Sequence, residues 1–168
     1  MPRFPFDLDA IDALPLWGQA LLAARMARRV AQALPAVPAA DWLVASSGVI
    51  ATCCSTGVFG DDEQYLQQRA NALRGDARVA AAAGALYYAA DSAFAAHDSG
   101  DFGAAEAACT NSAKLSIRAA AESQELNATQ IQIFAASDLD QLTFACGEFR
   151  LGRYDVITSD VLGRLVSV

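Results

Sequence analysis

"VAAAAGALYYAADSAFAAH", from Val79 to His97, spaces one set of its residues alternately four and three positions apart. That set is Val79, Ala83, Leu86, Ala90, Ala93 and His97. Residues three and four apart share one side of an α-helix, so the spacing predicts a long helix that packs along a seam of a helical bundle. Alanine, which fills most of the stretch, is the strongest helix former and allows close helix packing.

The rest of the chain repeats this composition, with proline and glycine between alanine-rich runs. Proline favours the first turn of a helix and glycine its end, so Pro15 and Pro38 predict helix starts, and Gly57 predicts a helix end. Apolar residues cover more than half of the helix expected at 39–55, which predicts that it lies at the centre. We expect an all-α fold: a single-domain compact bundle of six main helices, with an N-terminal arm at 1–14 and a tail at 150–168 that forms a short helix and docks on the bundle.

The chain carries 19 acidic and 12 basic residues, for a net charge of −7. Nucleic acids and anionic membrane surfaces attract positive proteins, so neither is an expected partner. A basic protein partner would be attracted instead, although mild acidity also simply keeps a protein soluble. There is no long uncharged apolar run to span a membrane, and the acidic amino terminus is unlike a secretory signal, so we expect a cytoplasmic protein.

The four cysteines, Cys53, Cys54, Cys109 and Cys146, lie among small and apolar residues in expected helices. No Cys-x-x-Cys pair is present, which disfavours a zinc site, and buried free thiols are the favoured interpretation. The sequence also lacks a phosphate-binding Walker loop, a dinucleotide-binding glycine motif and a nucleophile signature. We therefore expect no cofactor and no metal, and a binding protein is favoured over an enzyme.

"HDSGD", from His97 to Asp101, contains the only histidine of the chain, close to two carboxylates. One interpretation is a metal or acid–base site, which would need more converging ligands than this segment supplies. The other is a turn between two helices, in which Ser99 and Gly100 form the turn and Asp101 caps the next helix. The turn is favoured because every residue then has a structural role.

Arg25, Arg28 and Arg29 form the densest basic cluster, at helix positions i, i+3 and i+4. They could clamp a phosphate or carboxylate ligand, with Tyr87 and Tyr88 as further walls of a cleft between helices. They could instead pair with acids of neighbouring helices, and this structural interpretation is favoured.

Acidic residues dominate the second half of the chain, with eleven acids and five bases from Asp91 onward. If the helices that carry them adjoin, they form a negative patch for a partner; otherwise they are a solvated surface. Asp138 and Asp140 cannot act as a simple pair, because residues two apart point to different sides of a helix. The candidate partner-binding residues are Asp98, Asp101, Glu106, Asp138, Asp140 and Glu148.

The segment "LPLWGQALLAARMARRVAQALP" (14–35), followed by "YYAADSA" (87–93) and "DLDQL" (138–142), resembles small alanine-rich bacterial immunity proteins of the Imm-five type. The resemblance implies an all-α fold and neutralisation of a partner toxin by direct binding. The leading expectation is therefore an acidic protein-binding module that covers a basic toxin. A small-molecule binder or enzyme with an interhelical cleft is the second hypothesis. An obligate homo-oligomer that uses the helix at 39–55 as its interface is the third.

Overall fold

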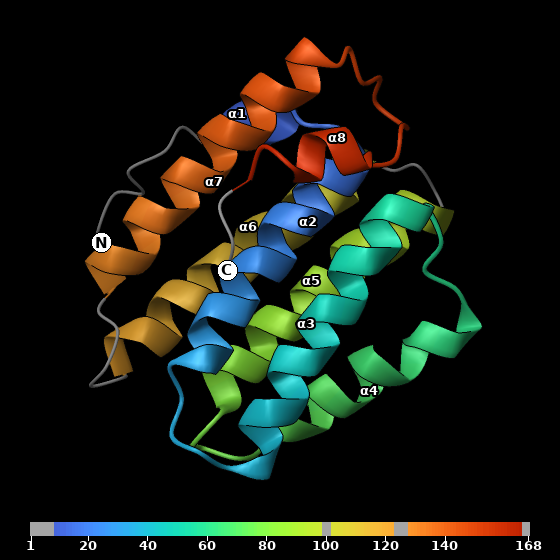
Figure 1. Cartoon of the computed structure of the whole chain (residues 1–168). Coiled ribbons are helices and arrows are strands. Elements are labelled where there is room, and N and C mark those ends of the chain that lie inside the picture. Colours follow the sequence, from blue (N-terminus) through green and yellow to red (C-terminus); the bar gives the residue numbers. More distant parts are fainter. Residues whose placement is uncertain (1–8, 99–101, 123–127, 166–168) are drawn as a thin grey trace.

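The computed structural model describes residues 9–98, 102–122 and 128–165, and in these ranges the fold is all-α, without strands. The helices along the chain are α1 (Asp9–Asp12), α2 (Leu16–Gln32), α3 (Pro38–Thr56), a 3-10 turn (Asp61–Glu63), α4 (Gln64–Leu73), α5 (Ala80–Asp98), α6 (Phe102–Glu122), α7 (Ala128–Glu148) and α8 (Ser159–Leu162). The six long helices, α2 to α7, form a bundle (Figure 1). This confirms the expected fold class, and α1 is a short additional helix inside the segment expected as an arm.

Helix α2 runs through the middle of the bundle, with α3 on one side and α7 on the other (Figure 1). Thirteen of its seventeen residues are buried, whereas α3 buries seven of nineteen. The prediction that the helix at 39–55 is central was therefore wrong. Alanines between the larger apolar residues of α2 let neighbours approach on several sides, while Val49 of α3 is 38% exposed.

The predicted ends of α3 are confirmed. Pro38 occupies the first turn, where its missing N–H leaves no hydrogen bond unmade. Gly57 ends the helix in the left-handed conformation with φ of 74°, and its N–H donates to the Cys53 carbonyl at 2.8 Å. A side chain at Gly57 would also meet Val156, since a Cβ there would lie 2.7 Å from its Cγ1. Glycine is therefore required for conformation and for space.

The alanine-rich α5 packs tightly against α6. Ser112 Oγ donates to the Ala85 carbonyl at 2.7 Å, and Ser92 Oγ donates to the Ala105 carbonyl at 3.2 Å. A Cβ at Gly84 would lie 2.8 Å from Leu115 Cδ1, so glycine permits this close approach. All members of the predicted seam except His97 are buried. The short residues thus bring two backbones close enough for side-chain hydroxyls of one helix to bond carbonyls of the other.

The segment after α7 runs back across the bundle and is held by backbone hydrogen bonds. Leu16 N–H donates to the Arg153 carbonyl at 2.9 Å, and Ile157 N–H donates to the Cys54 carbonyl at 2.9 Å. The side chains of Ile157 and Val161 are fully buried. These contacts fix the carboxyl-terminal segment against the ends of α2 and α3. None of the described helices has the length and apolar content needed to span a bilayer.

Candidate functional site

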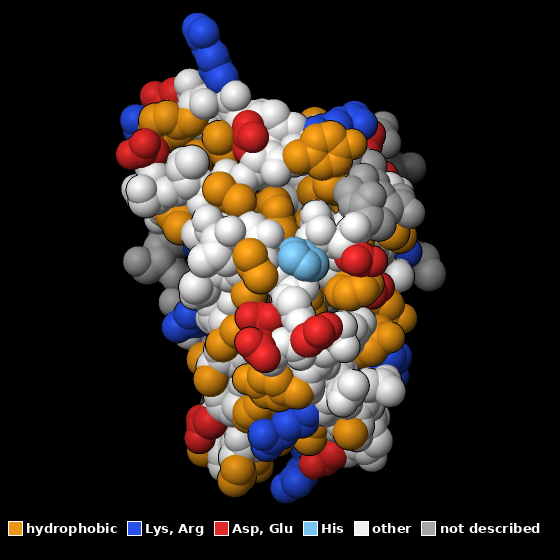
Figure 2. Space-filling model, turned by 90° about the vertical axis from the view of Figure 1, so that its right-hand side faces the viewer, with side chains coloured by type: hydrophobic (Ala, Val, Ile, Leu, Met, Phe, Trp, Pro, Cys, Tyr) orange, Lys and Arg blue, Asp and Glu red, His pale blue; other side chains and the backbone are white. Residues whose placement is uncertain are grey.

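The histidine of the predicted turn lies on the surface. His97 is exposed in the last turn of α5, and its Nδ1 lies 3.5 Å from the carbonyl oxygen of Gly57. Figure 2 shows the histidine side chain among hydrophobic and acidic neighbours on this side of the molecule. Asp98 is also exposed, whereas Ser99, Gly100 and Asp101 lie outside the described residues. Within the described ranges, no three Cys, His, Asp or Glu side chains converge to hold a metal ion.

Arg25 and Arg29 of α2 form an ion-pair cluster with Asp138 of α7. Arg25 Nη2 lies 2.9 Å from Asp138 Oδ1, and Arg29 Nη2 lies 3.3 Å from the same oxygen and 3.4 Å from Oδ2. The Asp138 side chain is only 1% exposed. The guanidinium carbon of Arg29 also lies 4.6 Å from the centre of the Phe134 ring, a cation–π contact. For these two arginines, the structure agrees with the predicted pairing to an acid of a neighbouring helix.

This burial removes Asp138 from the predicted acidic surface. A carboxylate that is 1% exposed and held by two guanidinium groups does not lie on the surface in this arrangement of α7, so Asp138 is not among the exposed acids of the chain. Asp140, two residues on, is exposed, as the helix geometry required. One carboxylate of this pair, Asp138, is therefore buried between α2 and α7, and the other, Asp140, faces solvent.

The remaining predicted acids lie on separate elements. Asp98 is at the end of α5, and Glu106 is half-buried near the start of α6. Glu148, near the end of α7, accepts a hydrogen bond from Arg164 Nη2 at 3.3 Å, so its charge is partly neutralised. Whether such acids meet depends on the packing order of the helices, which could not be predicted from the sequence.

Arg28 differs from the other two arginines of α2. It points toward α3, where its Nη1 would lie 3.6 Å from a Cβ built on Gly48. Among the described residues it forms no ion pair with an acid, whereas its buried Nε, like that of Arg29, has no hydrogen-bond partner. Arg28 is therefore a half-buried cation whose charge is not balanced by a neighbouring carboxylate.

Tyr87 and Tyr88 do not join these arginines. Their rings meet edge to face with centres 5.1 Å apart, and the guanidinium carbon of Arg74 lies 5.6 and 5.7 Å from the two ring centres. This aromatic cluster ties α5 to the end of α4, on the far side of the bundle from α7 (Figure 1). The contacts of the two tyrosines are therefore with Arg74, an arginine that the sequence analysis did not single out.

The most unusual exposed surface is the outer face of α7, defined by Ile133, Ser137, Asp140 and Phe144. Phe144 is 71% exposed and Ile133 is 58% exposed. Steps of four, three and four residues place all four side chains on one stripe, with the two apolar ones ~16 Å apart at 1.5 Å per residue. The sequence analysis missed this face. Its signal was available, because both large residues fall outside the apolar stripe that repeats along the same helix at Ile131, Ala135, Leu139, Leu142, Cys146 and Phe149.

The four cysteines are free and buried, as predicted. Burial raises the pKa of Cys53 and Cys146 to about 11 each and that of Cys109 to about 12, with neighbouring glutamates adding to the effect for Cys53 and Cys109. Burial also raises the pKa of Cys54 far above its usual range. Because the thiolate is the reactive form, these thiols are weak nucleophiles at neutral pH and act as small apolar side chains.

Comparisons of the chain with protein-family models, with curated proteins and with solved structures find no match.

Proposed function

We propose that this chain is a protein-binding module that contacts a basic protein partner through the outer face of α7. The observation that carries the proposal is the exposure of Phe144 and Ile133 on a stripe where an amphipathic helix ordinarily places polar residues. Aromatic side chains are enriched at protein interfaces, where a few buried residues carry most of the binding energy. Asp140 lies between them on the same stripe and supplies a charge for recognition.

The net charge of −7 supports a basic partner. Opposite net charge accelerates diffusional encounter, and mobile salt ions screen that attraction. The resemblance of the segment 14–35 to the Imm-five type of immunity protein supports the finer form of the proposal, in which the partner is a toxin whose working surface is covered. In this proposal, Asp140 increases the rate at which the basic partner associates, and Ile133 and Phe144 slow the dissociation of the complex.

The test is capture of partners from a lysate of the encoding organism on the immobilised full chain, in parallel with Phe144→Ser and Tyr154→Ser variants. Tyr154 is a matched control because it is 68% exposed but lies beyond α7. We expect one stoichiometric basic protein on the wild type and on Tyr154→Ser. Loss of an interface anchor of ~2 kcal/mol weakens binding roughly 30-fold, so Phe144→Ser should release it.

Equal capture by Phe144→Ser and wild type would overturn the assignment to α7. Sedimentation of the purified chain tests the homo-oligomer alternative in the same series. A dimer that dissociates in Phe144→Ser would assign the outer face of α7 to a second copy of this chain, and the basic-partner proposal would then be withdrawn.

A further inference from the structure

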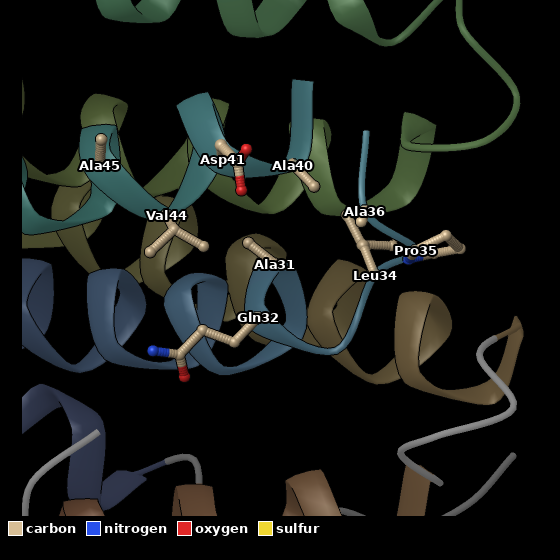
Figure 3. A pocket seen from close by; sticks show the side chains of 9 residues that line it. All are labelled: Ala31, Gln32, Leu34, Pro35, Ala36, Ala40, Asp41, Val44 and Ala45. Atoms are coloured by element: carbon tan, nitrogen blue, oxygen red, sulfur yellow. The ribbon is translucent and has the colours of Figure 1, made fainter. Parts of the chain in front are cut away.

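A hollow of about 450 Å³ lies between the end of α2 and the first half of α3. Figure 3 shows Ala31 of α2 and Val44 of α3 pointing toward each other across it, with Leu34 and Ala36 of the connecting segment at one end. The walls are mainly alanine, valine and leucine side chains, with Asp41 among the few polar residues. Small side chains on both helices leave this space unfilled, so an apolar group of a ligand could occupy it.

A cation lies one helical turn farther along the same groove. Arg28 precedes Ala31 by three residues on α2, and Gly48, which its Nη1 approaches, follows Val44 by four residues on α3. The two helices run side by side in opposite directions (Figure 1), so the Arg28–Gly48 approach lies one turn beyond Ala31 and Val44. The stretch of α3 that faces this rung, 44–52, contains no acidic residue. Arg28 thus lies one helical turn beyond the residues that line the hollow, on the same side of α2 as Ala31.

We propose that the groove between α2 and α3 binds a small amphipathic monocarboxylate, with its carboxylate on Arg28 and its apolar body in the hollow. The guanidinium group matches a carboxylate in charge and in planar hydrogen-bonding geometry. A carboxylate there would balance a half-buried charge that no described acid neutralises. Binding at this groove does not involve the outer face of α7, because α7 and α3 lie on opposite sides of α2.

Asp41 gives the site a selectivity for one charged end. Asp41 lies in the first turn of α3, seven residues before Gly48. At 1.5 Å per residue, this separation is ~10 Å along the helix axis. A second carboxylate at the far end of a ligand would therefore meet a like charge. The groove accordingly favours a monocarboxylate over a dicarboxylate of similar length.

The experiment is titration calorimetry of the full chain with octanoate, with the uncharged octan-1-ol and the eight-carbon dicarboxylate suberate as comparison probes. We expect saturable 1:1 binding of octanoate and much weaker binding of octan-1-ol, which lacks the charge, and of suberate, whose second carboxylate would approach Asp41. Arg28→Gln should weaken octanoate binding by about tenfold or more, as expected for loss of a charge-assisted pair. Arg118→Gln, at an exposed arginine that pairs only with Glu122 in the described structure, should bind like the wild type.

Two further variants test the location. Val44→Phe fills the hollow and should abolish octanoate binding, whereas Val49→Phe alters an exposed position of α3 outside it and should leave binding unchanged. Thermal unfolding of each variant confirms that it is folded. Unsaturable binding, equal affinity for octanoate and octan-1-ol, or wild-type affinity in Arg28→Gln would each overturn the proposal.

Discussion

The two sides of α7 depart from the usual amphipathic pattern in opposite ways. Its inner side buries the carboxylate of Asp138, and its outer side exposes the ring of Phe144. The carboxylate is compensated within the chain, since Arg25 and Arg29 reach it from α2. The ring remains 71% exposed. One departure therefore serves the fold, and the other is available to a partner.

Burial together with contacts inside the chain distinguishes a residue that stabilises the fold, such as Asp138, from one that is available for binding, such as Phe144. Taking ions out of water is costly, and the two guanidinium groups offset that cost only in this arrangement of α2 and α7. Asp138 thereby helps to specify how α7 docks on the central helix. Burying a phenylalanine side chain is worth ~1.5–3 kcal/mol, and this free energy is largely unused at Phe144 in the isolated chain.

The largest expected effect is on the inner side of α7. Asp138→Ala leaves two guanidinium groups without their buried counter-ion, and the arginine side chains are only 12% and 14% exposed. We expect a loss of ~3–5 kcal/mol in the free energy of unfolding, measured by urea denaturation. Asp140→Ala is the matched control, because this exposed carboxylate should change stability by no more than ~0.5 kcal/mol. Similar losses in both variants would contradict the inside–outside distinction.

A second variant tests whether the charge itself or the filled space stabilises this interface. Replacing Arg25 and Arg29 by methionine and Asp138 by leucine keeps the volume and removes all three charges. Since apolar replacement of a buried ion cluster is often neutral or stabilising, we expect this triple variant to regain most of the stability lost in Asp138→Ala. Denaturation of the triple variant and of Asp138→Ala under the same conditions measures the recovery. A triple variant as unstable as Asp138→Ala would mean that the ion pairs contribute more than packing can replace.

Much of the secondary structure could be predicted from local chemistry, but the packing order could not. Pro38 and Gly57 mark the ends of α3, and the i, i+2 spacing of Asp138 and Asp140 predicts that they face different sides. The partner of Asp138 lies 113 residues away at Arg25, and no local pattern identifies it. The central position of α2 was missed for the same reason, because alanine-rich sides look alike until their neighbours are known. The exposure of Phe144, by contrast, follows from the periodicity of α7 alone.

The thiol of Cys146 reports on the inner side of α7. Burial raises its pKa from 9.0 to about 11, so the folded state favours the neutral thiol. Its contribution to stability is therefore fully present below pH 9 and is lost as the pH rises from about 9 to about 11, because only the unfolded chain ionises readily in that range. We expect slow alkylation of Cys146 at pH 8, measured site by site by mass spectrometry, and faster alkylation in Asp138→Ala. Equal rates in the two proteins would show that the ion-pair cluster does not control the docking of α7.

The smallest effect on stability is expected on the outer side. Phe144→Ser removes an apolar side chain that the fold leaves in water, so we expect the free energy of unfolding to change by no more than ~0.5 kcal/mol. Leu142→Ala, two residues away on the inner side and fully buried, should cost ~2–5 kcal/mol. Urea denaturation of both variants makes the comparison. A loss above ~1 kcal/mol for Phe144→Ser would mean that the ring supports the fold, and lost partner capture could then reflect instability. If the free energy of unfolding of Phe144→Ser is unchanged, any loss of partner capture by this variant is due to the lost contact with the partner.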